Sequence, residues 1–151
     1  MKILNSWLND FGAFGNDSEK LAAAMTSLGL AVESVSIVGK PVKGVVVAKV
    51  LRTERHPDAA KVHRVYVDAG DGKELHVWCG AFNMKPGDLI PLATLGTTMP
   101  DGRVITPRGI LGIDSHGMLC SGTELGITAD ADGILILPKD LKLGSEVFAA
   151  L

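Results

Sequence analysis

Long hydrophobic runs, a secretory signal and a cysteine framework are all missing from this sequence of 151 residues. Charge or glycine interrupts its apolar runs within about ten residues, which is far short of a membrane span. The N-terminal segment MKILNSWLND lacks the apolar core and the small-residue cleavage site of a signal peptide. Two cysteines, Cys79 and Cys120, are too few for a disulfide framework. These absences favour a reduced, cytoplasmic protein that does not enter a membrane.

Aromatic residues are also scarce, at 5% of the chain, whereas there are 18 glycines and 7 prolines. This composition indicates many turns and a β-rich body built on Val, Ile and Leu. Neither G-x-G-x-x-G nor G-x-x-x-x-G-K-[ST] occurs, and the GDG and PDG segments fall in turns between predicted strands. We therefore expect no phosphate-gripping loop and no nucleotide site in this chain.

Zinc binding and nucleophilic catalysis are the next classes to consider. His76-x-x-Cys79 and His116-x-x-x-Cys120 contain zinc-ligand residue types. A spacing of three along a strand, however, points His76 and Cys79 to opposite faces, and no CxxC knuckle is present. The segment around Ser121 lacks the G-x-S-x-G elbow of a serine nucleophile. We expect neither a metal site nor a catalytic centre, and we interpret both cysteines as small buried hydrophobic residues.

The larger part of the chain is predicted to be mainly β. Expected strands cover 44–54, 62–69, 74–79, 89–96, 103–112 and 133–138. Turn sequences rich in Gly and Asp separate them, and residues 120–127 are predicted to form one or two helical turns. This pattern fits a five-stranded OB-fold barrel with a short helix. A β-sandwich is the competing architecture, but it usually has seven or more evenly spaced strands.

The N-terminal segment has a different pattern. Asp17 is a candidate N-cap of an amphipathic helix, and Gly29 stands where a C-cap glycine belongs. An apolar, strand-like piece follows over residues 30–38. Trp7 and Phe11 have helical spacing, so we expect them to pack into a small core. One helix with one or two strands cannot close a core alone, and this segment needs a partner.

Charge is distributed unevenly along the chain. Residues 40–64 contain seven Lys or Arg and two acids, a local net charge of +5, whereas residues 65–151 contain six Lys or Arg and eleven acids, a net charge of −5. A basic stretch of this kind is consistent with an RNA-binding surface. The alternative is that the charges are interspersed on a solvated surface and cancel in space.

Alternation in VHRVYV and ELHVWC places four polar or aromatic side chains on one face: Arg64, Tyr66, His76 and Trp78. Val65 and Val77 would then face the core. Rings and cations on the second and third strands form the usual OB-fold surface for oligonucleotides. The alternative is that Trp78 is a core residue or lies under a loop.

Three blocks of this sequence resemble the tRNA-binding OB-fold domain of several aminoacyl-tRNA synthetases and stand-alone tRNA-binding proteins. HPDAAKV resembles the H-P-[ND]-A-[DE]-[KR]-[LV] signature, VWCGAFNMKPGDLIPLATLG its V-C-G-A-x-N-[VI]-x-x-G segment, and GILGIDSHGMLCS its R-G-V-x-S-x-G-M-[LI]-[CA]-S block. The blocks occur in the same order over residues 42–144. Ala60 departs from the signature, where an acid is usual, and Phe82 stands where the family often has proline.

The two ends of the chain are similar to the β subunit of bacterial phenylalanyl-tRNA synthetases. At the N-terminus, MKILNSWL resembles that family's M-K-x-S-x-x-W-L pattern, and the helix that ends in LGLAVE resembles its L-G-L-E-V-E pattern. Near the C-terminus, DADGILILPKDLKLG resembles its D-D-x-x-G-I-L-x-L-P-x-D-x-x-x-G pattern. The resemblance implies that residues 1–39 are the helix and strand of a split α/β domain and that residues 40–151 are the tRNA-binding OB-fold domain. It implies an α2β2 parent ligase that uses ATP and Mg²⁺, with no catalytic centre and no cofactor in this fragment.

The resemblance also implies an auxiliary contact to tRNA through a basic loop and one sheet face. The expected tRNA-binding residues are His56, Lys61, Arg64, Tyr66, Trp78, Asn83, Ser115 and Ser121. Cations would meet phosphates, and rings would stack on bases. Asn83 and the two serines would bond the RNA backbone or 2′-hydroxyls, or else satisfy turns of the barrel. The expected partners are tRNA and the α subunit, with no membrane and no DNA. The alternatives are a subunit-packing module without RNA contact, or a stand-alone tRNA-binding protein.

Overall fold

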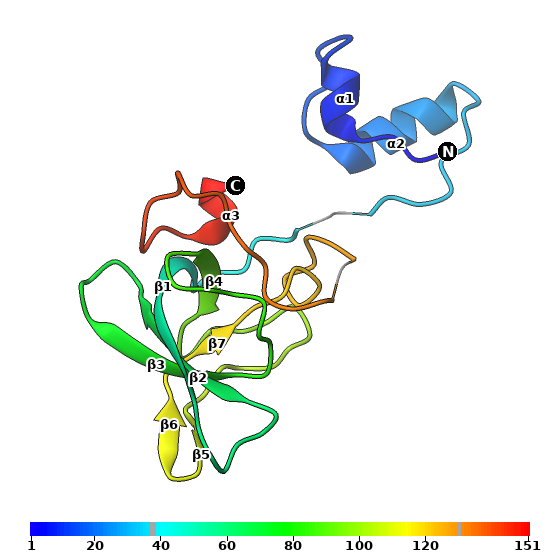
Figure 1. Ribbon diagram of the computed structural model, residues 1–151. Coiled ribbons are helices and arrows are strands. Elements are labelled where there is room, and N and C mark those ends of the chain that lie inside the picture. The colour runs from blue at the N-terminus through cyan, green and yellow to red at the C-terminus, as the bar shows by residue number, and fades with distance from the viewer. Residues whose placement is uncertain (37–38, 130) are drawn as a thin grey trace. The chain divides into compact units, whose positions relative to one another are not determined.

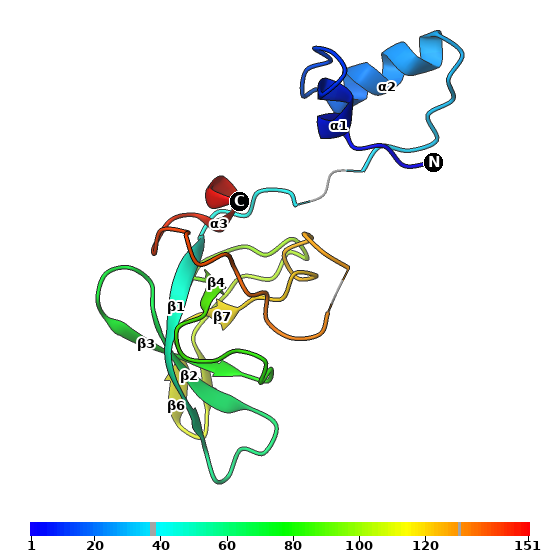
Figure 2. The same cartoon turned by 45° about the horizontal axis from the view of Figure 1, so that its top comes forward.

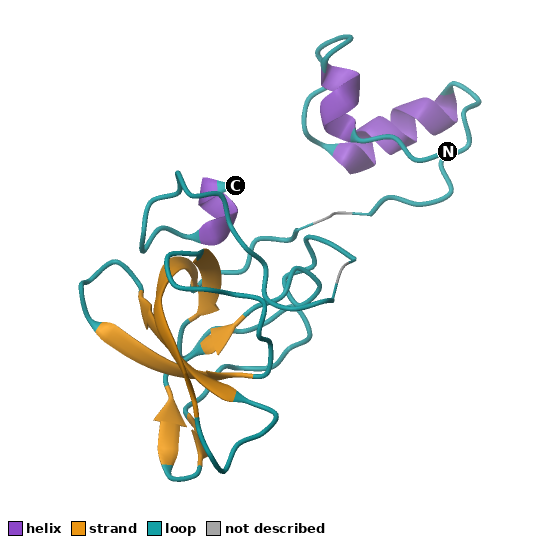
Figure 3. Cartoon of the chain, in the orientation of Figure 1, coloured by secondary structure: helices purple, strands orange, loops and turns teal. Residues whose placement is uncertain are grey.

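The computed structural model describes residues 1–36, 39–129 and 131–151 and is drawn in Figure 1. The chain divides into two compact units, residues 1–37 and 38–151. The sequence predicted a division after residue 39. Figure 3 shows that the described part of the first unit consists of helices and loops, whereas the second is built mainly from strands and loops.

The first unit contains two helices, α1 (Asn5–Asn9) and α2 (Ser18–Ser27). The α2 helix begins after the predicted N-cap, because the Asp17 carboxylate accepts the Lys20 N–H at 3.0 Å. Gly29 follows the helix with φ +87°, a left-handed conformation that favours glycine and ends helices. Both predicted ends of this helix are therefore present.

The structure differs from the sequence-based expectation for this unit in two respects. Residues 30–36 form no strand, and the last two residues of the predicted strand lie outside the described part of the chain. A strand needs a neighbour to pair its backbone groups, and α1 and α2 supply none. Trp7 and Phe11 remain 58% and 89% exposed, because two short helices bury too little surface to form a core.

Five antiparallel strands form the main sheet of the second unit, in the order β3-β2-β1-β4-β7. Their bounds are β1 Val45–Arg55, β2 His63–Asp68, β3 Glu74–Cys79, β4 Leu89–Ala93 and β7 Met118–Leu119. A separate hairpin joins β5 (Arg108–Ile110) to β6 (Ile113–Ser115), and helix α3 covers Val147–Ala150. This half-barrel confirms the predicted mainly β, five-stranded OB-like fold.

The β1 strand pairs with different neighbours along its length. Its first half pairs with β4 and its second half with β2, with a register irregularity between Val50 and Arg52. Beside the first half, the Gly144 N–H donates to the Val47 carbonyl at 2.8 Å, and the Val47 N–H donates to the Ser145 carbonyl at 2.9 Å. The segment 144–145 thus bonds to the first half of β1, on the edge that pairs with β2 farther along the strand. In both views the β5–β6 hairpin lies beside the loop that follows β1 (Figures 1 and 2).

Two groups of buried apolar side chains form the core. One surrounds the starts of β1 and β4 and includes Leu125 and Val147 from the C-terminal part. The other lies under β2 and β3 and contains Val65 and Val77, both fully buried. The predicted alternation along these strands is correct, so the polar residues between the valines lie on the opposite face.

Both cysteines are buried free thiols, as the sequence predicted. Burial raises the pKa of Cys79, and it raises the pKa of Cys120 to about 12. Neither thiol ionises near neutral pH, so both behave as small hydrophobic residues.

Some weak elements were not predicted correctly. The segment 133–138 contributes one bridge, between Leu89 and Leu137, rather than a strand. Residues 120–127 form hydrogen-bonded turns rather than a helix. The β6 and β7 strands are only three and two residues long, which is too short for alternation to be recognised.

Gly144→Ala is expected to destabilise the fold more than Gly72→Ala. Both glycines have positive φ, +77° and +73°, so alanine brings similar backbone strain of about 1–2 kcal/mol at each. A β-carbon at Gly144 would lie 2.7 Å from the carbonyl oxygen of Ala69, whereas one at Gly72 would meet nothing within 4 Å. Urea unfolding should show an additional loss of about 1–3 kcal/mol for Gly144→Ala. Equal losses would contradict the close approach of the C-terminal segment to the turn after β2.

Candidate nucleic-acid interface

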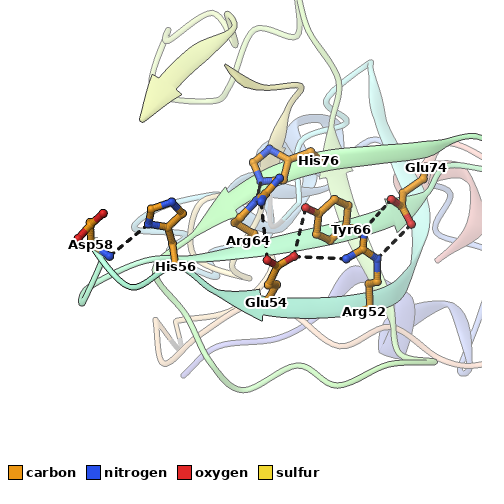
Figure 4. A network of polar contacts seen from close by, with 8 residues as sticks. All are labelled: Arg52, Glu54, His56, Asp58, Arg64, Tyr66, Glu74 and His76. Atoms are coloured by element: carbon orange, nitrogen blue, oxygen red, sulfur yellow. Dashed lines mark hydrogen bonds and ion pairs between the residues drawn. The ribbon is translucent and has the colours of Figure 1, made fainter. Parts of the chain in front are cut away.

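The face of β1, β2 and β3 opposite the buried valines carries a connected set of side chains, drawn in Figure 4. We call this set the outer-face network, and it consists of Arg52, Glu54, Arg64, Tyr66, Glu74 and His76. Arg52 lies opposite Tyr66 in the β1–β2 register, and Tyr66 lies opposite His76 in the β2–β3 register. Cross-strand neighbours on one face are close enough to interact, so the register itself assembles the network.

Arg52 covers the ring of Tyr66. Its guanidinium carbon lies 3.6 Å from the ring centroid. Its Nη2 and Nε atoms donate to the two carboxylate oxygens of Glu74 at 3.0 and 3.4 Å, and Nη1 donates to Glu54 at 3.4 Å. The hydrogen bond with Glu74 raises the pKa of Arg52. Tyr66 is only 7% exposed, beneath a cation that two acids hold in place.

Arg64 forms an ion pair with Glu54, and its Nη1 lies 3.8 Å from Oε1 of Glu54. Its Nε donates to Nε2 of His76 at 3.1 Å, and Nδ1 of His76 lies 3.0 Å from the carbonyl oxygen of Asp114. These partners assign the ring proton to Nδ1 and leave Nε2 as the acceptor. Burial lowers the pKa of His76. The hydrogen bond to the Asp114 carbonyl raises this pKa, whereas the charge of Arg64 lowers it further.

The β5–β6 hairpin covers Trp78. The indole Nε1–H donates to the Ile113 carbonyl at 2.9 Å, and the residue is 9% exposed. The Ser115 hydroxyl accepts the Trp78 N–H at 3.1 Å and donates to the Gly117 carbonyl at 3.0 Å. The sequence left open whether Trp78 is exposed on the outer face, lies in the core or lies under a loop, and the structure has the ring under the β5–β6 hairpin. Neither Tyr66 nor Trp78 presents an open ring face in this structure, although both lie on the predicted face.

The loop 56–62 between β1 and β2 is organised by His56. Its Nδ1 accepts the Asp58 N–H at 3.2 Å, and its carbonyl accepts the Ala59 N–H at 3.1 Å. Its ring lies edge-on to Trp78, with centroids 6.1 Å apart. His56 thus closes the turn and fixes the loop beside the covered tryptophan. Lys61, near the end of this loop, is exposed.

Three exposed cations lie at this end of the sheet and hairpin: Arg55, Lys61 and Arg108. Within residues 1–36, 39–129 and 131–151, none of them forms an ion pair. The Arg55 guanidinium carbon lies 5.4 Å from the ring centroid of Phe82. These cations therefore differ from Arg52 and Arg64, which the glutamates of the outer-face network hold.

The predicted site residues with amide or hydroxyl side chains, Asn83, Ser115 and Ser121, also form hydrogen bonds within the protein. The Asn83 carboxamide donates to the Ile134 carbonyl at 2.8 Å and accepts the Ile134 N–H at 3.0 Å. Ser121 and Glu124 form a capping box: the Glu124 carboxylate accepts the Ser121 N–H at 2.9 Å, and the Ser121 hydroxyl accepts the Glu124 N–H at 3.2 Å. With Ser115 bonded as described above, the groups expected to reach RNA are engaged in the fold.

Sequence reasoning placed three members of the outer-face network on this face, Arg64, Tyr66 and His76. It missed Arg52, Glu54 and Glu74, which hold the network together. Two of these three residues could have been placed on this face from the sequence. Arg52 and Glu54 are two residues apart in a predicted strand, so both belong to one face. Their partner Glu74 is 22 residues from Arg52, and only the hairpin register brings it there.

In the described part of the chain, no three His, Cys, Asp or Glu side chains gather closely enough to hold a metal ion. Among these same residues, no helix has the length and apolar character needed to cross a membrane.

Comparisons with known proteins point in one direction. Residues 45–146 match the family model described as "Putative tRNA binding domain". The chain is 42% identical over 151 residues to the phenylalanine–tRNA ligase β subunit of Anaeromyxobacter dehalogenans, covering all of this chain and 19% of that protein. It is 40% identical over 147 residues to the corresponding subunit of Nitratidesulfovibrio vulgaris, covering 97% and 18%. The chain thus spans about a fifth of the length of these curated relatives.

A solved structure supports the fold. The crystal structure of a MetRS-related protein from Pyrococcus horikoshii superposes with a TM-score of 0.51 at 20% identity, covering 68% of this chain and 87% of that one. At this level of identity the likeness concerns the architecture, and it agrees with the OB-like half-barrel described above.

The stability of the protein should fall as the pH drops below about 6.5. The pKa of His76 is lower in the folded chain than its ordinary value, so the unfolded state takes up the proton first. Unfolding free energy is therefore highest above the unfolded pKa and decreases with falling pH until the folded ring is also protonated. The pKa of His63 is lowered by burial and acts in the same direction. His76→Gln should flatten this decline in urea unfolding between about pH 7 and pH 5. An unchanged pH dependence would contradict the neutral ring inferred for His76.

Proposed function

The chain belongs to the tRNA-binding domain family that its residues 45–146 match, and we propose that it binds tRNA at the end of the barrel where β1 runs into the loop 56–62. It acts as an auxiliary module of phenylalanine–tRNA ligase. In this proposal the chain contributes a contact to tRNA and no catalytic step.

The observation that carries this proposal is the difference between two kinds of cation in one region. Arg52 and Arg64 are held by glutamates, whereas Arg55, Lys61 and Arg108 are exposed and, in the described part of the chain, form no ion pair. An exposed cation without an ion pair can meet a phosphate and release counterions from the RNA without breaking an ion pair in the protein. The unpaired group therefore provides the first contact with RNA.

The outer-face network has a different role in this proposal. Its two arginines and two glutamates cancel in formal charge, so it adds little long-range attraction. Arg52 and Arg64 reach phosphates only by exchanging a carboxylate for a phosphate oxygen. Base stacking on Tyr66 requires Arg52 to move, and stacking on Trp78 requires the hairpin to move. Phosphate contact by the unpaired cations requires neither movement, and the proposal relies on it.

The role of the parent protein is also a proposal. Identity of 40–42% over nearly the whole chain supports a parent that is an α2β2 ligase joining phenylalanine to its tRNA. Such an enzyme uses ATP and Mg²⁺, pairs this subunit with an α subunit and acts in the cytoplasm. ATP, Mg²⁺ and the aminoacylation site are assigned to other parts of that enzyme.

A specific observation favours a second candidate, a subunit-packing module with no RNA contact. Hydrogen bonds within the protein engage the side chains of Asn83, Ser115 and Ser121. The rings of Tyr66 and Trp78 are buried. A domain retained only as a scaffold would have this character. The two candidates differ in whether the unpaired cations bind RNA.

Titration of the chain with tRNA at roughly 50 and 200 mM salt separates these candidates. Lys61→Ala and Arg55→Ala should each weaken binding and reduce the slope of log K against log salt by about 0.7–1. Lys73→Ala is the matched control. Lys73 is exposed in the turn between β2 and β3, at the end of β2 that lies away from the loop 56–62. No binding by the parent chain at low salt would support the scaffold. Equal losses in all three variants would contradict the proposed location.

Glu54→Gln should increase the affinity for tRNA. Glu54 contacts both Arg52 and Arg64, and the amide keeps its shape without its charge. Exposed ion pairs contribute about 0.2–1 kcal/mol, so the expected gain is up to about fivefold at low salt. Asp71→Asn changes the net charge equally, in the turn between β2 and β3. If both variants bind equally tightly, net charge alone accounts for the gain and the competition between Glu54 and phosphate is refuted.

A further inference from the structure

The tip of the β5–β6 hairpin has an unusual backbone conformation. Among residues 1–36, 39–129 and 131–151, Leu111 is the only non-glycine residue with positive φ, at +52°. Gly112 follows with φ +74°, and the two form the loop between Ile110 and Ile113. Positive φ at both central residues is the arrangement of a type I′ turn, for which Asn-Gly is strongly preferred. A leucine here is strained, because its β-carbon crowds the backbone.

The strained side chain has no compensating burial, since Leu111 is 52% exposed. A leucine packed in the core could offset backbone strain by removing apolar surface from water, but an exposed leucine gains little in this way. Residues in strained backbone conformations cluster at functional sites, including sites that clamp a ligand. A contact between Leu111 and a partner outside this chain would account for the strained conformation.

The hairpin holds its tip in a fixed position. The indole of Trp78 donates to the Ile113 carbonyl at 2.9 Å, and the ring of His76 donates to the Asp114 carbonyl at 3.0 Å. Both bonds anchor β6 to β3, immediately after the turn that carries Leu111. An apolar group held in place before binding loses little conformational freedom when a partner arrives.

The surroundings of the tip indicate the chemistry of that partner. The hairpin lies beside the loop 56–62, in which Lys61 is exposed, and Arg108 lies on the hairpin itself (Figures 1 and 2). Asp114 is the acid of the hairpin, and it lies across from Gly109 in the β5–β6 register. Arg108 pairs with Ser115 at the end of the hairpin away from the tip. A hairpin with an apolar tip, an exposed cation at its other end and an exposed lysine in the neighbouring loop suits an unpaired nucleotide, whose base offers an apolar face and whose phosphates are anionic.

We propose that Leu111 packs against an unstacked nucleobase of the bound tRNA, while Arg108 and Lys61 contact neighbouring phosphates. This inference rests on the proposed function and adds a residue that reads an exposed base. It also explains why a leucine occupies a turn position that favours asparagine.

The test is to replace Leu111 with the residue that the turn prefers. Leu111→Asn should raise the midpoint of thermal unfolding by about 2–4 °C, because the strain is relieved. The same variant should bind tRNA about fivefold more weakly, with an unchanged salt slope, because the lost contact is apolar. Leu95→Asn is the matched control: Leu95 is 41% exposed and lies in the loop that contacts Gly44, at the start of β1. It should leave tRNA affinity unchanged.

A second readout does not depend on a substitution. With methyl-labelled leucine, the Leu111 resonances should shift on addition of tRNA, whereas those of Leu95 should not. If Leu111→Asn binds as tightly as the parent chain, the inference fails and the proposed function stands. If the variant is no more stable than the parent, the argument from strain is overturned. If the parent chain binds no tRNA at low salt, the inference and the proposed function fail together.

Discussion

The antiparallel pairing of β1 with β2 determines which side chains meet on the outer face. Val50 lies opposite Val67, and after the irregularity that follows it Arg52 lies opposite Tyr66. Because side chains alternate along a strand, a shift of one residue would move the valines out of the core and the charged residues into it. The buried valines of β2 and β3 therefore hold the register, and the register brings Arg52, Glu54 and Arg64 together. The C-terminal segment supports the same strand by bonding Val47 from the other side.

Charges on the outer face pair with one another across β1, β2 and β3. The basic stretch 40–64 has a net charge of +5 in sequence, yet two of its arginines are held by acids: Arg64 by Glu54, and Arg52 by Glu54 and by Glu74 of β3. At physiological salt, exposed charges interact over about 8 Å, so this local pairing matters more than the net charge of the whole chain. In the proposed function, the unpaired cations supply the attraction to phosphate, and the outer-face network adds little to it. A contact of this limited strength would suit the auxiliary role proposed for the chain.

The sequence predicted those features that depend on local pattern. Alternation placed Val65 and Val77 in the core, and the caps of α2 followed from Asp17 and Gly29. The sequence left other features undecided between two alternatives, because these features depend on distant partners. Trp78 is covered by a hairpin 35 residues later in the chain, and Asn83 bonds to Ile134, 51 residues away. A polar side chain in a plausible site motif is therefore free for RNA only if the fold leaves it unsatisfied, and this is a property of tertiary structure.

The central claim is that tRNA meets this chain at the end of the barrel formed by the loop 56–62 and the β5–β6 hairpin. Backbone amide NMR during titration with tRNA tests it most directly. The account predicts that the shifted resonances concentrate in residues 55–62 and 108–114, and that they return toward their original positions as salt is added. Shifts concentrated in the turn 69–73 or in α3, or no shifts at low salt, would contradict it.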